Sequence, residues 1–258
     1  MHRYAPGDIV SRYGTLGARR DPVTQPVLIL ATNTSEKMNG QALYTCMPVF
    51  SPSHRPNSAD SLQITQDGAS GLWGSLGQIC MTGEETFTSG VNAQLDPKEL
   101  AAVRERLGRL SPSKHFGEVV YSASPSHDGT QGKNNRPYVR IGEIGKNTNK
   151  FLCIPISSHP AQSGAGFEIT DRQAAGLSRD DGDKSFTRDS WLCAVSGDQS
   201  SLPAGKLSEA DRKELMASFQ HLKQCLVKGE ITPTPPVPLP KIHSPETLSV
   251  APSKAWTH

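Results

Sequence analysis

The sequence lacks any run of about 18 apolar residues, the length that a membrane-spanning helix needs, so no membrane partner is predicted. The first ten residues, MHRYAPGDIV, lack the basic-then-apolar layout of a secretory signal. No two of the five cysteines have CxxC spacing. An odd number of cysteines without an export signal favours reduced, buried thiols and a cytoplasmic location, and argues against a disulfide framework or a zinc site.

The sequence also lacks a strong excess of one charge. It has 27 basic and 25 acidic residues, a net charge of +2, so a nucleic-acid partner would need a local basic patch. The segment SRDDGDKS, residues 178–185, gathers three aspartates but has no later glutamate of a calcium loop. We therefore predict a solvated loop there, no metal and no cofactor.

The sequence does contain a long internal repeat. TCMPVFSPSH, residues 45–54, resembles FLCIPISSHP, residues 151–160, with Cys46 and Cys153 separated by 107 positions. PGDIV matches FGEVV, QPVLIL matches RPYVRI, and ICMTG matches LCAVSG, in the same order along the chain. Such ordered similarity predicts two copies of one unit of about 110 residues, a normal domain size.

Each copy has the pattern of several short strands followed by one helix. The segments IVSRYG, PVLILAT, ALYTCMPVF, SLQIT and GQICMT are rich in β-formers and are separated by turn residues. Asp96 and Ser208 are predicted N-caps, with Glu99 and Asp211 at the capping-box position. Apolar residues then recur at helical spacing and predict a stripe that packs on the strands. These residues are Leu100, Val103, Leu107 and Leu110, and Leu215, Phe219, Leu222 and Leu226.

The organisation that follows is mainly β with C-terminal helices, an α+β class. We predict a first barrel or sandwich over residues 1–112, a second over 113–228, and a Pro-rich, disordered tail over 229–258.

The repeated unit resembles the MazF/PemK toxin family. The resemblance rests on a Gly–acid–apolar–Val start, a Gly-rich loop leading into Arg-Pro, and a strand ending in Pro-x-hydroxyl. GTQGKNNRPYVRI and FLCIPISS carry these features in the second copy. The resemblance implies tandem SH3-like barrels and an endoribonuclease of a toxin–antitoxin system. It also implies single-stranded RNA as substrate, a cognate antitoxin as partner, and growth inhibition or plasmid maintenance as the biological role.

The resemblance assigns site residues in the second copy. Arg136 takes the position of the family's catalytic arginine and Ser157 that of its hydroxyl residue. Gln131 stands where many members have glutamate, and the first copy has Gln25 and Phe50 in place of Arg136 and Ser157. The first copy is therefore expected to be degenerate and the pair to act as an intramolecular pseudo-dimer. Lys133 and Arg140, with Arg136, are expected to contact phosphates, and Asn134 and Asn135 to read bases.

Metal-free cleavage needs a base for the ribose 2′-hydroxyl, an acid for the leaving oxygen and a cation for the phosphoryl oxygens. Arg136 suits the third role, because its planar guanidinium stays charged and binds two oxygens at once. His159 is one candidate for the base, and His127 with Asp128 is another. A non-catalytic pair of barrels that binds protein or nucleic acid is the alternative function, favoured by Gln131 and by the absence of the family's Arg-x-Asp element.

Overall fold

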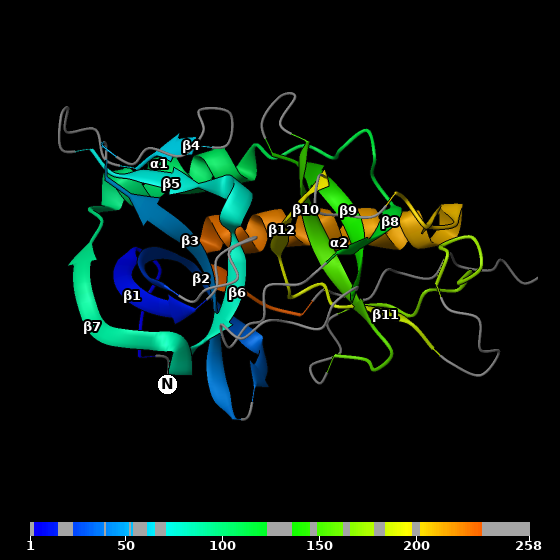
Figure 1. The fold of residues 1–258 in the computed structure, drawn as a ribbon, viewed down its shortest axis with the longest axis horizontal. Coiled ribbons are helices and arrows are strands. Elements are labelled where there is room, and N and C mark those ends of the chain that lie inside the picture. Colours follow the sequence, from blue (N-terminus) through cyan, green and yellow to red (C-terminus); the bar gives the residue numbers. More distant parts are fainter. Residues whose placement is uncertain are drawn as a thin grey trace, which may run out of the picture.

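The computed structural model describes residues 3–14, 23–38, 40–51, 53, 61–64, 71–122, 136–144, 149–161, 166–177, 184–197 and 202–233. The protein is mainly β, with a curled half-barrel sheet and a C-terminal helix (Figure 1). The first repeat contains β1 (Asp8–Gly14), β2 (Val23–Met38), β3 (Gln41–Phe50), β4 (Ser61–Gln63), β5 (Trp73–Ser75), η3 (Leu76–Gln78), β6 (Cys80–Gly83), η4 (Glu84–Thr86), β7 (Phe87–Gln94) and α1 (Pro97–Gly108). The second repeat contains β8 (Glu118–Ser122), β9 (Arg136–Glu143), β10 (Lys150–Ser157), β11 (Phe186–Thr187), β12 (Cys193–Ser196), β13 (Gly205–Lys206) and α2 (Glu209–Lys228), and β14 (Glu230–Ile231) follows.

The two repeats have matching strand orders. The first sheet runs β4-β5-β3-β2-β1-β7, with β6 paired to β3, and the second runs β11-β10-β9-β8-β13, with β12 paired to β10. The strand pairs described within each repeat are antiparallel. The repeat seen in the sequence is therefore also a repeat of topology, because β1, β2, β3 and β6 correspond to β8, β9, β10 and β12.

A glycine before the first strand of each repeat shows how closely the backbones agree. Gly7 and Gly117 both have positive φ, 101° and 83°, which a residue with a Cβ rarely adopts. The Gly7 N–H donates to the Ile29 carbonyl, and the Gly117 N–H donates to the Arg140 carbonyl, both at 2.9 Å. In each repeat the segment before the helix is hydrogen-bonded to this glycine. The backbone N–H of Leu95 donates to the carbonyl of Gly7, and that of Leu207 donates to the carbonyl of Gly117.

Both helices begin at the predicted caps. The Asp96 carboxylate accepts hydrogen bonds from the backbone N–H groups of Lys98 and Glu99, and Glu99 completes the capping box. Ser208 accepts from the backbone N–H of Asp211 at the start of α2. These caps satisfy N–H groups that have no partner inside the helix, which is why the local sequence predicts them correctly.

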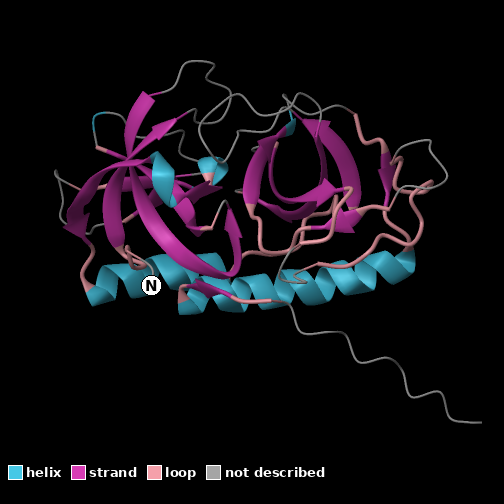
Figure 2. Cartoon of the chain, turned by 90° about the horizontal axis from the view of Figure 1, so that it is seen from below, coloured by secondary structure: helices cyan, strands magenta, loops and turns pink. Residues whose placement is uncertain are grey.

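The two helices pack against each other on one side of the sheets (Figure 2). Val103 and Leu107 of α1 and Leu215, Phe219 and Leu226 of α2 are buried in one continuous apolar cluster. That cluster takes in both repeats, so the predicted stripes serve one shared core. Each repeat adds a smaller cluster on the other face of its sheet.

The chain returns to the first repeat after α2. Gly229 ends the helix with φ of 81°, and β14 then pairs in parallel with β2, Glu230 opposite Thr32 and Ile231 opposite Asn33. The sequence predicts a disordered tail from residue 229, but residues 229–233 are described and include a strand, so the structure corrects the start of that tail. The Pro-rich composition does not predict this pairing, because it depends on β2, whose paired residues lie 198 positions earlier. Residues 234–258 lie outside the described chain.

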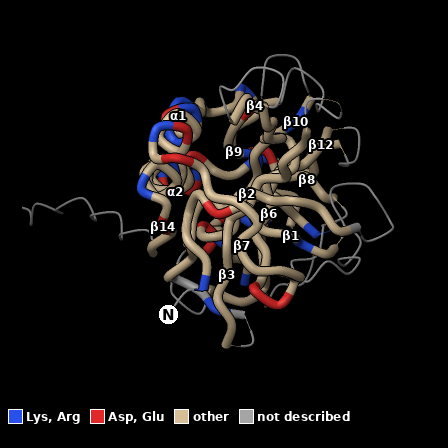
Figure 3. The backbone as a smooth tube through the Cα atoms, turned by 90° about the vertical axis from the view of Figure 1, so that its left-hand side faces the viewer, with Lys and Arg blue, Asp and Glu red and all other residues tan. Residues whose placement is uncertain are grey.

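Charged residues of both signs line the two helices (Figure 3). Ion pairs one turn apart join Glu105 to Arg109 and Glu209 to Lys213. These exposed pairs contribute little stability, but they keep either sign from dominating the helical surface. Among the described residues, no helix combines the length and apolarity needed to cross a membrane.

Candidate nucleic-acid interface

One face of the second sheet carries three cross-strand rows of side chains. Strand pairing sets these rows, because residues directly opposite on neighbouring strands point to the same face with Cβ atoms about 5 Å apart. The rows are Glu118–Arg140–Cys153–Cys193, Val120–Tyr138–Pro155–Arg188 and Ser122–Arg136–Ser157–Phe186. The third row lies at the ends of β8 and β10 and at the start of β9.

The third row brings Arg136 and Ser157 to one place. β9 and β10 pair with Tyr138 opposite Pro155, and the same register continued by two residues puts Arg136 opposite Ser157. Ser122 flanks Arg136 on β8, so hydroxyl groups stand on both sides of the guanidinium. The juxtaposition expected from the resemblance is therefore consistent with the strand pairing.

Trp191 adds an aromatic surface to the row. The Arg136 Cζ lies 6.0 Å from the centroid of the Trp191 ring, and the Arg188 Cζ lies 5.4 Å from it. Two guanidinium groups thus share one indole ring, an arrangement in which each cation is attracted to the ring. Both arginines and the tryptophan are half-buried, so the cluster reaches the surface.

A turn that is hydrogen-bonded to α2 and to β10 holds this aromatic cluster. The backbone N–H of Trp191 donates to the backbone carbonyl of Arg188 at 2.8 Å. This bond closes a turn over Asp189 and Ser190, which are both buried. Ser218 of α2 donates its hydroxyl to the buried carboxylate of Asp189. The Arg188 N–H also donates to the Pro155 carbonyl at 3.0 Å. Helix and strand together therefore fix the positions of Arg188 and Trp191.

Arg140 lies two rows away and has a different environment from the one expected. Its Nη1 donates to Glu118 Oε2 at 2.9 Å, and its Cζ lies 4.1 Å from the centroid of the Phe151 ring. Its side chain is only 8% exposed. The expectation that Arg140 contacts phosphate is corrected, because a carboxylate already balances its charge and its neighbours cover it. Alternation along β9 puts Arg136 and Arg140 on one face but does not show which is covered.

Ser157 and His159 form a compact turn at the end of β10. The backbone N–H of His159 donates to Ser157 Oγ at 3.2 Å, and His159 Nδ1 lies 2.9 Å from Ser158 Oγ. The His159 side chain is exposed, while Ser157 is half-buried. The hydroxyl of Ser157 accepts one bond in this turn and keeps its proton to donate to an oxygen of a ligand.

Several expected residues fall outside the described chain. Gln131, Lys133, Asn134 and Asn135, together with His127 and Asp128, belong to residues 123–135, which connect Ser122 to Arg136. Both ends of that connection are in the third row. The three aspartates of SRDDGDKS are likewise outside the described residues.

The first repeat has the same rows with other side chains. They are Asp8–Ile29–Cys46–Cys80, Val10–Val27–Pro48 and Arg12–Gln25–Phe50–Trp73. Gln25 and Phe50 therefore occupy the positions of Arg136 and Ser157, as the sequence comparison of the two copies predicts.

The four cysteines of the first rows lie opposite one another in pairs, Cys46 with Cys80 and Cys153 with Cys193. Burial raises the pKa of the Cys153 thiol to about 12 and that of Cys46 well above its ordinary value. Such thiols stay protonated near neutral pH, which fits packing better than redox chemistry. Within the described part of the chain, no group of three or more His, Cys, Asp and Glu residues is placed to hold a metal ion.

Comparison with known proteins gives no family. No family model matches the chain, and a search of curated proteins found no relative.

Arg188 and Trp191 are the site residues that the sequence reasoning missed. They stand in FTRDSW, just before the LCAVSG that matches ICMTG of the first repeat. A difference between the two copies could have identified them, because the first repeat has Ser75 at the position of Arg188 and Gln78 at that of Trp191. An arginine and a tryptophan that replace small or polar residues beside a shared strand could have marked them.

Proposed function

We propose that the chain is a metal-independent endoribonuclease of the toxin type, built from two SH3-like barrels in one polypeptide. The observation that carries the proposal is the cluster of Arg136, Arg188 and Trp191 beside Ser157. Guanidinium groups bind phosphate oxygens, and an aromatic ring that reaches the surface offers a stacking surface for an unpaired base. A single-stranded RNA fits such a cluster better than a duplex, whose bases are already stacked.

The reaction proposed is attack of a ribose 2′-oxygen on the adjacent phosphorus. A bond forms between the 2′-oxygen and phosphorus, and the bond from phosphorus to the 5′-oxygen of the next nucleotide breaks. The products are a 2′,3′-cyclic phosphate and a free 5′-hydroxyl. Arg136 balances the charge that grows on the phosphoryl oxygens, and Ser157 donates a hydrogen bond to one of them. His159 is proposed as the base that removes the 2′-proton, and a protonated group or water supplies the proton for the 5′-oxygen.

The test is cleavage of a labelled single-stranded RNA in the presence of a chelator. The intact protein should cleave, and Arg136→Ala and Ser157→Ala should lose most of the rate. Arg109→Ala, which removes an exposed arginine at the C-cap of α1, should behave like the intact protein. Expression in a bacterium should arrest growth, and Arg136→Ala should relieve the arrest. An intact protein that neither cleaves RNA nor slows growth contradicts the proposal.

One observation favours a second function, RNA binding without cleavage. The His159 imidazole is exposed and its Nδ1 lies against Ser158, so the contacts described do not fix it toward the third row. RNA binding that depends on Arg136 and Trp191, with no cleavage over hours, would establish this second function instead.

A further inference from the structure

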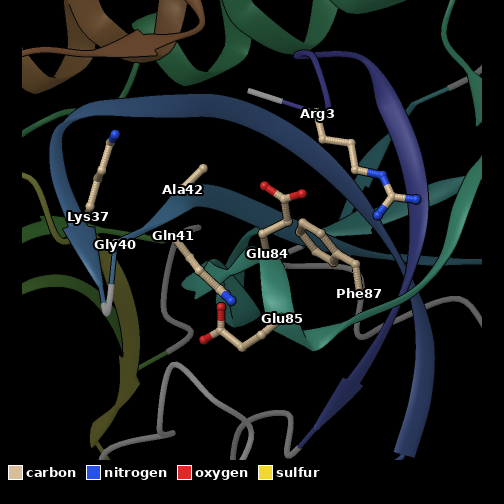
Figure 4. A pocket seen from close by; sticks show the side chains of 8 residues that line it. All are labelled: Arg3, Lys37, Gly40, Gln41, Ala42, Glu84, Glu85 and Phe87. Carbon is tan, nitrogen blue, oxygen red and sulfur yellow. The ribbon is translucent and has the colours of Figure 1, made fainter. Parts of the chain in front are cut away.

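A cavity of about 490 Å³ opens at the hairpin end of the first sheet, away from its third row (Figure 4). Lys37 and Gln41 line it from the β2–β3 hairpin, Arg3 from the segment before β1, and Glu84 and Phe87 from η4 and the start of β7. Figure 4 shows the Glu84 carboxylate beside the Phe87 ring, with Arg3 across the cavity from Lys37. Glu85 of η4 also lines it, so the cavity combines an aromatic ring, two carboxylates and two cations.

Contacts beneath the cavity hold the carboxylate and the ring in place. The Tyr44 hydroxyl donates to Glu84 Oε2 at 3.4 Å and accepts the backbone N–H of Arg3 at 3.2 Å. The rings of Tyr4, Tyr44 and Phe87 pack together with centroids 5.0 to 5.9 Å apart. Burial, with a smaller contribution from the charge of Glu84, raises the pKa of Tyr44 to about 12, so the phenol remains a donor at neutral pH.

This set of groups matches one class of ligand. An aromatic ring stacks on a flat base, and cations at the rim complement phosphate. A carboxylate accepts two hydrogen bonds side by side, and guanine alone among the four RNA bases has two adjacent N–H donors on its pairing edge. Adenine, cytosine and uracil each put an acceptor next to their donor, which a carboxylate repels.

We propose that this cavity binds a guanine nucleotide, with Glu84 on the N1 and N2 edge, Phe87 against the base, and Arg3 and Lys37 near its phosphates. Gln41 can donate its amide to the guanine O6. The first repeat, which has Gln25 and Phe50 in place of Arg136 and Ser157, would then contribute base recognition.

The cavity is placed to act on the same RNA as the arginine cluster. Asn33 Nδ2 donates to the carbonyl of Ser190, the neighbour of Trp191, at 3.3 Å. From Asn33, β2 continues for four residues to Lys37 at the cavity, a span of about 13 Å. That the bound guanine belongs to the substrate RNA rests on the proposed function, whereas binding of a free nucleotide does not.

The experiment is titration of the full-length protein with 5′-GMP, AMP, CMP and UMP by calorimetry. We expect GMP to bind at least about tenfold more tightly than the other three, since two matched hydrogen bonds discriminate by about that factor or more. Glu84→Gln should weaken GMP by about tenfold and remove the preference, because an amide turns a donor toward one guanine N–H. Glu105→Gln, the same change on the exposed face of α1, should leave GMP binding unchanged. Equal affinity for the four nucleotides, or undiminished GMP affinity in Glu84→Gln, overturns the inference.

Arg136→Ala separates this inference from the proposed function. It should abolish RNA cleavage and leave GMP binding unaltered. GMP-selective binding by a protein that cleaves no RNA would overturn the ribonuclease and keep the nucleotide site. Cleavage by a protein without guanine preference would overturn the nucleotide site alone.

Discussion

Comparison of the third rows shows how one backbone can support two surfaces. In the second repeat Arg136 is half-buried against Trp191, with Ser157 expected opposite it. In the first repeat the row's arginine, Arg12, is 2% exposed and donates from Nε to Thr82 Oγ1 at 2.9 Å. The first arginine is therefore packed in the interior, whereas the second reaches the surface.

The rows nearer the core differ less. Val10 and Val120, Pro48 and Pro155, and the four cysteines occupy equivalent places in both sheets. Small apolar side chains are retained where packing leaves no room for change, because interiors are close-packed. The side chains at the strand ends have diverged, and those ends are where function is expected.

The largest effect should come from the core that the repeats share. Leu107 of α1 and Phe219 of α2 are equivalent and both fully buried. We expect Phe219→Ala to lower the free energy of unfolding by about 3 to 5 kcal/mol and Leu107→Ala by about 2 to 5 kcal/mol. Denaturant unfolding should remain a single transition in both variants. Two separate transitions would show that the repeats are independent domains.

The next comparison sets Arg136 against Gln25, its counterpart. Removing a cation that stabilises transition-state charge costs about 100- to 1,000-fold in kcat, so Arg136→Ala should show a loss of that size. Gln25→Ala should stay within about twofold of the intact protein. Single-turnover cleavage of the same RNA measures both. Equal losses in the two variants would contradict the division between a degenerate and an active repeat.

Ser218 has a smaller role, acting through the turn that carries Trp191. Ser218→Ala leaves the buried Asp189 carboxylate without this donor and should lower the free energy of unfolding by about 1 to 3 kcal/mol. RNA affinity should fall as well, because the turn that carries Arg188 and Trp191 loosens. Gln220→Ala, at an exposed position of the same helix, is the control for both measurements. Reduced stability with unchanged RNA affinity would separate the turn from binding.

The smallest effect concerns the buried thiols. The folded pKa of Cys153 is about 12 against 9.0 for the free group, so above pH 9 the unfolded chain loses this proton first. The contribution of this thiol to the free energy of unfolding is fully present below pH 9 and is lost as the pH rises toward 12. Between pH 9 and 10 the loss is about 1 kcal/mol. Cys153→Ala should remove that part of the decline, and Cys46→Ala should do the same in the first repeat. Unfolding measured at pH 8, 9 and 10 checks both.

Features set by nearby residues could be predicted from the sequence. The caps at Asp96 and Ser208, the apolar stripes of both helices and the strand segments follow from local chemistry, and the structure confirms them. The repeat itself gave the correspondence of Arg136 with Gln25, because strand spacing is preserved between the copies.

Contacts between distant segments could not be predicted. Arg140 and Arg136 alternate with apolar residues in the same way, and only the approach of Glu118 and Phe151 distinguishes the covered Arg140 from the half-buried Arg136. The Trp191 turn depends on α2, and the cavity at Glu84 depends on a hairpin 40 residues earlier. Such long-range contacts have no local pattern.

The return of the chain to β2 through β14 couples the beginning of the polypeptide to its end. During synthesis the first repeat emerges complete in sequence but without the strand that later lies beside Thr32 and Asn33, and without α2 against α1. Its sheet and its share of the common core are finished only when Ile231 has left the ribosome. The first repeat can therefore complete its sheet and its share of the common core only after α2 and β14 have been synthesised.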